Sequence, residues 1–402
     1  MDLRSPFPAL RSDDPANRLT YLDCAATTPT PRPVLDAVAQ AMALGGSPGR
    51  SLHRLGFAAT QALAAAREAI AASLVARAEE LVFVRSATEG LNLVAAGWAG
   101  PRLGEGDVVV VGRDAHSSNL LPWLRLRGVT VEVVDCTASG ELDLDDLARV
   151  LGPRTRVVAL THVSNVTGAV TPIAAVAAAI RASAAAGALL VVDGAQALAH
   201  LPIDLSRLGC DVYVASAHKT YGPPGFGFVW ARERCWAETE PLVVGGGAVV
   251  SLDLDRGEVR YVDGPGRLEA GTANLPGAAG TAAALRWLAE NRDLERERQL
   301  VREAEDALAE RRGVTLLGRP RERVGVFSFV VDGVHAHDVA SILDSRGVAV
   351  RAGHLCAQPL LRRFGQTSAV RASLGVFNDR GDVERLVAGI AEVQRVFGGA
   401  GR

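Results

Sequence analysis

The 402-residue chain contains one lysine, Lys219, although Lys and Arg together number 43. An amine that can lose its proton can act as a nucleophile or form an imine, whereas the guanidinium of arginine stays charged. The lysine lies four residues after the end of an apolar run at residues 211–215. A single lysine is also compatible with chance in an arginine-rich chain, so its neighbours decide the interpretation.

Apolar runs typical of buried strands alternate with helical patterns through the first part of the chain. In order, they lie at residues 81–84, 107–112, 129–134, 156–160, 188–192 and 211–215. Fully apolar strands separated by helices predict a mainly parallel sheet that is covered on both faces. Functional sites of such sheets lie at the carboxyl ends of the strands.

Polar side chains follow four of these runs. His116 and Asn165 come after the second and fourth runs. Asp193 and Gln196 come after the fifth run, and Lys219 after the sixth. Because parallel strands share one carboxyl edge, these side chains should meet there. Their convergence favours a catalytic site over chance.

This set of residues fits the needs of pyridoxal phosphate, whose protonated ring acts as an electron sink. Lys219 would form an imine with the cofactor aldehyde, and Asp193 would keep the ring nitrogen protonated. His116 would lie against the ring face, and Asn165 and Gln196 would reach the ring oxygen. We therefore predict pyridoxal 5'-phosphate as the cofactor.

The turn after the first strand is a candidate phosphate site. A strand, a small polar turn and a helix start form a geometry that holds phosphate groups. We expect Thr88, Ser216 and His218 to hold the phosphate, and we include Glu89 among the cofactor-binding residues. A Ser or Thr in such a turn is also an ordinary helix N-cap, so the turn alone is weak support.

The second part of the chain mixes strands and helices without strict alternation, which predicts a smaller α+β domain. We expect one long charged helix at residues 281–312, a strand at 324–331 and a terminal amphipathic helix at 380–397.

We divide the chain into two domains. Residues 19–280 would form the large cofactor-binding domain, and residues 1–18 and 281–402 the small domain. His335 and His337 lie at a helix start in the small domain, which is more typical of surface caps than of metal ligands, and no metal site is expected.

Composition gives no support for several classes of function. The formal net charge of −2 provides no basic surface for nucleic acid or an anionic membrane. Five cysteines without paired metal-ligand spacing are typical of reduced thiols. No apolar run reaches membrane-spanning length, and the start of the chain lacks a signal pattern. We expect a cytoplasmic enzyme without nucleic-acid or membrane partners.

Several motifs carry a resemblance to a known family. They are Thr88-Glu89-Gly90, Thr161-His162-Val163-Ser164-Asn165, Asp193-Gly194-Ala195-Gln196, His218-Lys219, Glu269-Ala270-Gly271-Thr272, Arg351-Ala352-Gly353-His354-Leu355-Cys356 and Arg371-Ala372-Ser373. With these motifs the chain resembles the group II cysteine desulfurases, the sulfur-mobilisation and selenocysteine-lyase-like branch of the class V aminotransferases. The resemblance covers nearly the whole chain. It implies an α/β, type I pyridoxal-phosphate-dependent transferase fold with a seven-stranded sheet, working as a homodimer.

The resemblance also implies residue roles. Thr272 would reach the phosphate in the partner subunit. Arg371 would bind the substrate carboxylate, and Asn165, Arg351 and His53 are further substrate-binding candidates. Cys356, on a short loop, would take sulfur from L-cysteine as a persulfide and leave L-alanine. The sulfur would pass to an acceptor protein, with iron–sulfur cluster assembly as one destination.

Lys219, His116 and Cys356 are the predicted catalytic residues. Lys219 would move the Cα proton, and the Cys356 thiolate would attack the substrate sulfur. Such a cysteine should be exposed, whereas a merely structural cysteine would be buried in apolar surroundings.

Four residues depart from the family pattern, one of them Pro224, a second proline after the lysine. Ser117 and Leu355 stand where the family often has histidine, and Ala217 where it has serine. The first two lie near the substrate side, so a carbon–sulfur lyase, selenocysteine lyase, aminotransferase or epimerase of the same family stays an alternative. A cofactor-binding regulator is less favoured, because such proteins usually lose the lysine, the aspartate or the substrate arginine.

Overall fold

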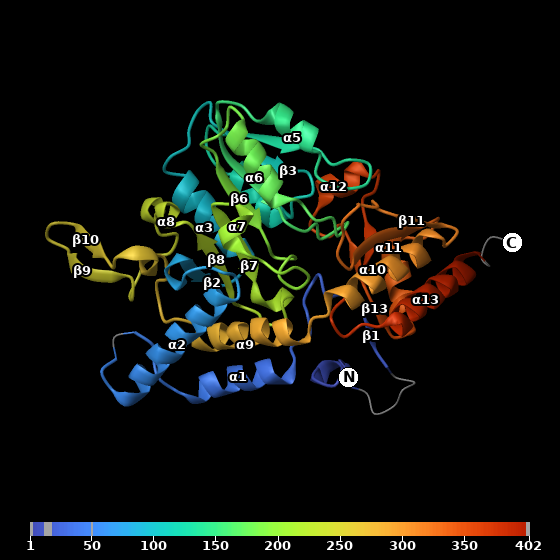
Figure 1. Ribbon diagram of the computed structural model, residues 1–402, viewed down its shortest axis with the longest axis horizontal. Helices are drawn as coiled ribbons and strands as arrows, with labels where there is room; N and C mark the ends of the chain where they lie inside the picture. The colour runs from blue at the N-terminus through green and yellow to red at the C-terminus, as the bar shows by residue number, and fades with distance from the viewer. Residues whose placement is uncertain (1–2, 12–17, 50, 399–402) are drawn as a thin grey trace.

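A computed structural model describes residues 3–11, 18–49 and 51–398. Within this part of the chain, the largest sheet has seven strands in the order β2-β8-β7-β6-β5-β3-β4 (Figure 1). Its strands are β2 (Leu81–Val84), β3 (Val108–Gly112), β4 (Thr130–Val134), β5 (Thr155–Thr161), β6 (Leu189–Asp193), β7 (Val212–Ser216) and β8 (Gly227–Ala231). Each apolar run in the sequence matches one of these strands to within a residue at either end, while β8 was not predicted.

The sheet is mainly parallel, as predicted. Strands β4, β3, β5, β6 and β7 pair in parallel, whereas β8 runs antiparallel to both β7 and β2. The carboxyl ends of β5, β6 and β7 therefore lie side by side. Polar residues that follow these three strands are brought together by the pairing itself.

Helices cover both faces of this sheet (Figure 1). Alternate residues of β3 show why: Val108 and Val110 belong to one apolar core, and Val109 and Val111 to the other. The first core includes residues of α2 (Arg54–Ala72) and α6 (Ile173–Ala182), and the second includes residues of α3 (Ala87–Leu93). Burial on both faces accounts for strands that read as continuous apolar runs.

A second, four-stranded antiparallel sheet has the order β11-β12-β15-β14. Its strands are β11 (Val314–Leu316), β12 (Val326–Val331), β14 (Arg351–Gly353) and β15 (Ala369–Ser373). Residues of α10 (Leu294–Ala309), α11 (Ala336–Ser345) and α13 (Arg380–Gly398) share its apolar core. The short strand β1 (Thr20–Tyr21) pairs with β13 (Val348–Ala349), so the N-terminal segment joins this second unit.

The single long helix predicted at residues 281–312 is wrong. The structure has α9 (Leu275–Asn291) and α10 instead, and α9 packs against α1 (Arg32–Ala43) and α2 (Figure 1). The break has a local cause, because the Asp293 carboxylate caps α10 and accepts hydrogen bonds from two of its first backbone N–H groups. The predicted domain boundary after residue 280 falls inside α9, and the division of the chain into two domains stays a prediction.

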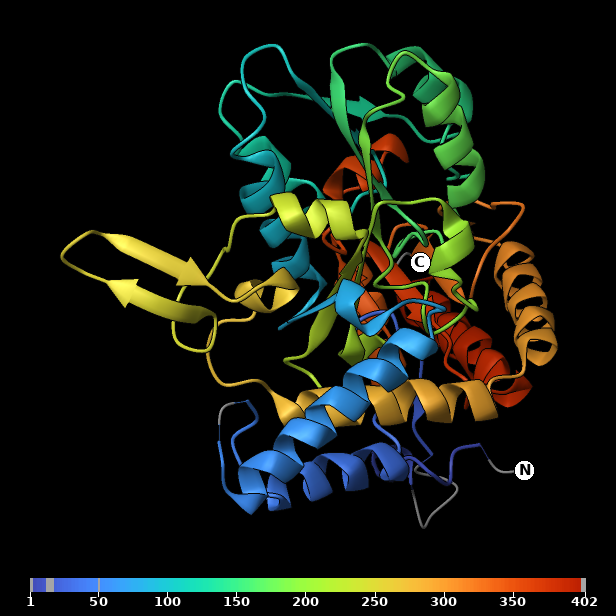
Figure 2. The ribbon, with the colours of Figure 1, turned by 60° about the vertical axis from the view of Figure 1, so that its left-hand side comes forward.

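The remaining helices are short. They are α4 (Leu121–Leu124), α5 (Leu144–Val150), α7 (Leu205–Leu208), α8 (Glu233–Glu238) and α12 (Gln358–Arg363). The antiparallel hairpin of β9 (Val249–Asp253) and β10 (Glu258–Tyr261) projects from the body of the molecule (Figure 2). Among the described helices, none combines the length and apolar character needed to cross a lipid bilayer.

The N-terminal segment is held to α13 by a buried carboxylate. Asp382 is fully buried and accepts hydrogen bonds from Arg4, Arg18, Thr20 and Asn378. Residues 1, 2 and 12–17 of this segment lie outside the described residues. A buried charge of this kind is tolerated because several donors surround it.

We expect Asp382→Ala to destabilise the protein by roughly 3–5 kcal/mol, since it leaves buried donors without an acceptor. Glu384→Ala on the same helix is the matched control, because it removes only an exposed ion pair with Arg380 and should cost less than about 1 kcal/mol. Urea unfolding of the two variants measures both effects. Equal losses would show that the buried cluster does not hold the arm.

Candidate active site

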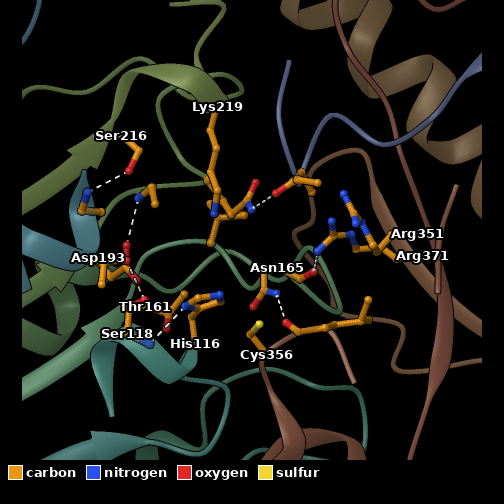
Figure 3. A pocket seen from close by; sticks show the side chains of 18 of the residues that line it. His116, Ser118, Thr161, Asn165, Asp193, Ser216, Lys219, Arg351, Cys356 and Arg371 are labelled. Atoms are coloured by element: carbon orange, nitrogen blue, oxygen red, sulfur yellow. Dashed lines mark hydrogen bonds between the residues drawn. The ribbon is translucent and has the colours of Figure 1, made fainter. Parts of the chain in front are cut away.

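A cavity of about 590 Å³ lies at the carboxyl edge of the large sheet. Its volume is within the range of small-molecule sites in proteins. Residues after β5, β6 and β7 form one side, and the segment 351–356 together with Arg371 of β15 forms the other (Figure 3). The two sheets thus meet at the cavity.

The structure brings most of the predicted site residues to this cavity. Those that line it are Thr88, His116, Asn165, Asp193, Gln196, Ser216, His218, Lys219, Arg351, Cys356 and Arg371. The convergence expected from the strand ends is therefore observed.

Three predicted site residues lie elsewhere. Glu89 is in the first turn of α3, where its carboxylate accepts hydrogen bonds from the backbone N–H and side chain of Arg85. His53 caps α2 by accepting from Gly56 N, and its side chain is exposed. Thr272 lines a second pocket. Within one chain, these three residues do not contribute to the cavity.

Lys219 and Asp193 face the same cavity from neighbouring strands (Figure 3). Lys219 ends the turn Ala217–Lys219 after β7, and Asp193 is the last residue of β6. Burial lowers the pKa of the Lys219 amine, and burial raises the pKa of the Asp193 carboxyl while the lysine charge opposes that rise. The environment therefore favours the unprotonated, nucleophilic amine.

His116 is a neutral ring at the cavity wall. Burial, together with the positive charges of Lys219 and Arg371, lowers the pKa of His116 to about 4. Its Nδ1 accepts a hydrogen bond from Ser118 N at 3.1 Å, which requires that this nitrogen carries no proton. An uncharged, oriented imidazole suits the predicted position against a cofactor ring.

Hydroxyl groups gather beside His116 and near Lys219 in the cavity. Thr88 Oγ1 lies 2.8 Å from Ser118 Oγ, and Ala87 N donates to Ser216 Oγ at 2.8 Å. Burial, followed by the charge of Lys219, lowers the pKa of His218 to about 4. Sequence reasoning missed Ser118, although its place two residues after His116 at a strand end was a usable signal.

Unpartnered polar atoms line the cavity. Thr161 Oγ1 and Asn165 Oδ1 are buried and have no hydrogen-bond partner in the described part of the chain. Such atoms are rare unless a ligand or water satisfies them. Together with the hydroxyls and with the Asp193–Lys219 pair, they fit a phosphorylated, ring-containing cofactor. Thr161 was not predicted, since a threonine ending an apolar strand is common.

Asp23 organises the opposite wall. Its carboxylate lies 2.8 Å from Arg351 Nη2, and it accepts a hydrogen bond from Arg371 Nη2 at 3.3 Å. Arg371 also donates to Asn165 O at 3.2 Å and is almost completely buried. One carboxylate therefore faces two guanidinium groups, which leaves a net positive site suited to an anionic substrate group. Asp23 was part of the matched sequence but was not predicted as a site residue.

Cys356 is the exposed member of the five cysteines, all of which are described, and this confirms the prediction of an accessible thiol. Burial raises the pKa of each of the other four thiols. Cys356 lies in the short loop between β14 and α12. Because exposure is a requirement for a reactive cysteine, Cys356 is the one suited to chemistry at this cavity.

The chain is similar to known proteins over nearly its whole length. The pattern of the family described as aminotransferase class-V matches residues 20–386. A cysteine desulfurase of Klebsiella pneumoniae is 39% identical, with 98% of each chain covered. The solved structure of cysteine desulfurase CsdA from Escherichia coli, in its S-sulfonic acid form, has a TM-score of 0.87 at 36% identity and covers 98% of both chains. An apo cysteine desulfurase from Thermococcus onnurineus has a TM-score of 0.90 at 34% identity, with coverage of 98% and 97%.

These similarities confirm the resemblance and the type I pyridoxal-phosphate fold expected from the sequence. They also agree with the cavity, in which a lysine, an aspartate and an exposed cysteine meet. The chain belongs to the aminotransferase class-V family.

Proposed function

We propose that this chain is a pyridoxal-phosphate-dependent cysteine desulfurase. The observation that carries the proposal is the exposed Cys356 thiol, which lines the same cavity as Lys219 and Arg371. The relatives named cysteine desulfurase match the chain over nearly its full length. In the net reaction, the Cβ–S bond of L-cysteine breaks, an S–S bond forms on Cys356, and a proton replaces sulfur to give L-alanine.

The residues at the sheet edge would hold the cofactor. Lys219 would bind its aldehyde, Asp193 its ring nitrogen, and the Thr88–Ser118 hydroxyl pair its phosphate. The neutral His116 would lie against its ring. When bound, pyridoxal phosphate supplies an electron sink that makes cleavage of bonds at Cα and Cβ of an amino acid feasible.

Lys219 and Arg371 have separate tasks in this proposal. Arg371 binds the α-carboxylate of L-cysteine and so fixes which way the substrate faces. The Lys219 amine takes the Cα proton and holds it for return, and burial, which lowers its pKa, favours the unprotonated form that this step needs. The Cys356 thiolate then attacks the substrate sulfur from the opposite side of the cavity (Figure 3).

The proposal includes a homodimer and an acceptor protein. Thr272 lines its own pocket with Phe83 and Asn274, outside the cavity of its own chain, as expected for a residue that serves the partner's site. The projecting hairpin exposes Leu252 and Leu254, which a second copy would cover. The persulfide would pass from Cys356 to an acceptor, for example in iron–sulfur cluster assembly. The free thiols favour a reducing, cytoplasmic setting.

Borohydride treatment of the cofactor-loaded enzyme should attach cofactor mass to the peptide that holds Lys219. Lys219→Arg is the matched control, because it keeps a long basic side chain at this position but cannot form an imine. Mass spectrometry of the digested proteins should find the adduct in wild type and not in the variant. An adduct on any other peptide of the wild type would contradict the assignment.

Arg371→Lys should raise the KM for L-cysteine by about tenfold or more, because a lysine cannot make two parallel hydrogen bonds to a carboxylate. Arg351→Lys should have a smaller effect, since the Arg351 side chain is half exposed. Steady-state alanine formation measures both. If Arg371→Lys leaves KM unchanged and Arg351→Lys raises it, Arg351 is the substrate anchor.

Cys356→Ala should still bind cofactor, while its release of alanine from L-cysteine should fall to near background. Cys235→Ala, which alters a buried thiol outside the cavity, should keep its activity. Wild type mixed with L-cysteine should also gain the mass of one sulfur atom on the peptide that holds Cys356, and a reductant should remove it. Full activity of Cys356→Ala without such an adduct would rule out the desulfurase mechanism.

A further inference from the structure

Ser117 is hydrogen-bonded to the backbone of the candidate sulfur-accepting cysteine. Its backbone N–H and its hydroxyl both donate to the carbonyl oxygen of Cys356, at 2.8 and 2.9 Å. Ser117 begins the 3-10 turn Ser117–Asn119 that follows β3 in the large sheet. The loop that carries Cys356 is therefore held by direct hydrogen bonds to the strand ends of the large sheet.

The neighbouring peptides of the loop are also held. Asn165 Nδ2 donates to the carbonyl of Leu355 at 2.8 Å, and Cys356 N donates to His354 Nδ1 at 3.0 Å. The carbonyls of two consecutive residues are thus bound by side chains that come from the strand ends of the large sheet. These bonds define the orientation of the peptide units on both sides of the Cys356 Cα atom.

The loop needs such support because of its backbone conformation. Leu355 and Cys356 have φ angles of 53° and 52°, in the left-handed region that is unfavourable for residues other than glycine. Two successive residues of this kind persist only where the surroundings hold them. The Leu355 side chain packs in an apolar cluster with Cys136 and Leu360, and the bonds from Asn165 and Ser117 hold the polar side.

We propose that Ser117 is a positioning residue, which holds the Cys356 thiol where it can attack the substrate sulfur. The inference rests on the proposed function, in which Cys356 accepts sulfur. A short hydroxyl side chain suits this contact, because it reaches the carbonyl beside its own N–H and lets one residue make both bonds. Ser117 is not among the residues that line the cavity, so in this role it acts through the loop.

Ser117→Ala removes the hydrogen bond from the hydroxyl to the Cys356 carbonyl and leaves the hydrogen bond from the backbone N–H. Alanine formation from L-cysteine should lose between about tenfold and a hundredfold in kcat, as expected when a reacting atom is misplaced. The KM should stay within about twofold of wild type, because the Arg371 contacts are unchanged. Ser117→Thr retains a hydroxyl donor and should recover most of the lost activity. Ser345→Ala removes an exposed hydroxyl bonded to Ile342 O and serves as the neutral control.

Alkylation of Cys356 by iodoacetamide distinguishes positioning from a change in thiol chemistry. In Ser117→Ala the alkylation rate should equal or exceed that of wild type, because a released loop leaves the thiol accessible and chemically intact. An unchanged kcat would overturn the inference. A parallel fall in kcat and alkylation rate would also overturn it, since Ser117 would then affect thiol reactivity. Loss of activity in Cys356→Ala with none in Ser117→Ala would remove this inference alone and leave the desulfurase proposal intact.

Discussion

The parallel pairing of β6 with β7 places a carboxyl group and an amine at one edge of an apolar sheet. Asp193 ends the first strand and Lys219 follows the second, and both side chains line the cavity. Burial raises the pKa of the carboxyl and lowers the pKa of the amine. These shifts exist because apolar cores on both faces of the sheet keep water from the strand ends. The packing of the sheet therefore causes the pKa shifts on which the proposed chemistry depends.

The second sheet completes the cavity by supplying charge and a thiol. Its strands β14 and β15 carry Arg351 and Arg371, and Asp23 beside β1 faces both guanidinium groups. Because β1 pairs with β13, the N-terminal segment belongs to this wall, although the two strands lie far apart in the sequence. The cavity is thus assembled where the two sheets meet, and such a junction is a common place for ligand sites. Contacts across this junction, such as those of Asn165 and Ser117 with the cysteine loop, decide where the thiol lies.

Local patterns in the sequence accounted for much of the fold. Six apolar runs became strands because burial on both faces requires continuous apolar side chains. The same periodicity could not reveal the break between α9 and α10, since it depends on one capping aspartate within a charged stretch, Asp293. The strand β8 was also not predicted, although its residues form an apolar run like those of the other strands, and only its antiparallel place between β2 and β7 is a property of the assembled sheet.

By itself, the sequence determined the residue types of the site and their places after the strands. The rarity of lysine, the polar strand ends and the family motifs pointed to Lys219, Asp193 and Cys356. The tertiary structure decided which further residues act with them. Asp23 contacts Arg371 across 348 positions, and Ser117 contacts Cys356 across 239 positions. Hydrogen bonds between residues so far apart leave no periodic trace in a sequence, because they depend on how separate elements pack in three dimensions.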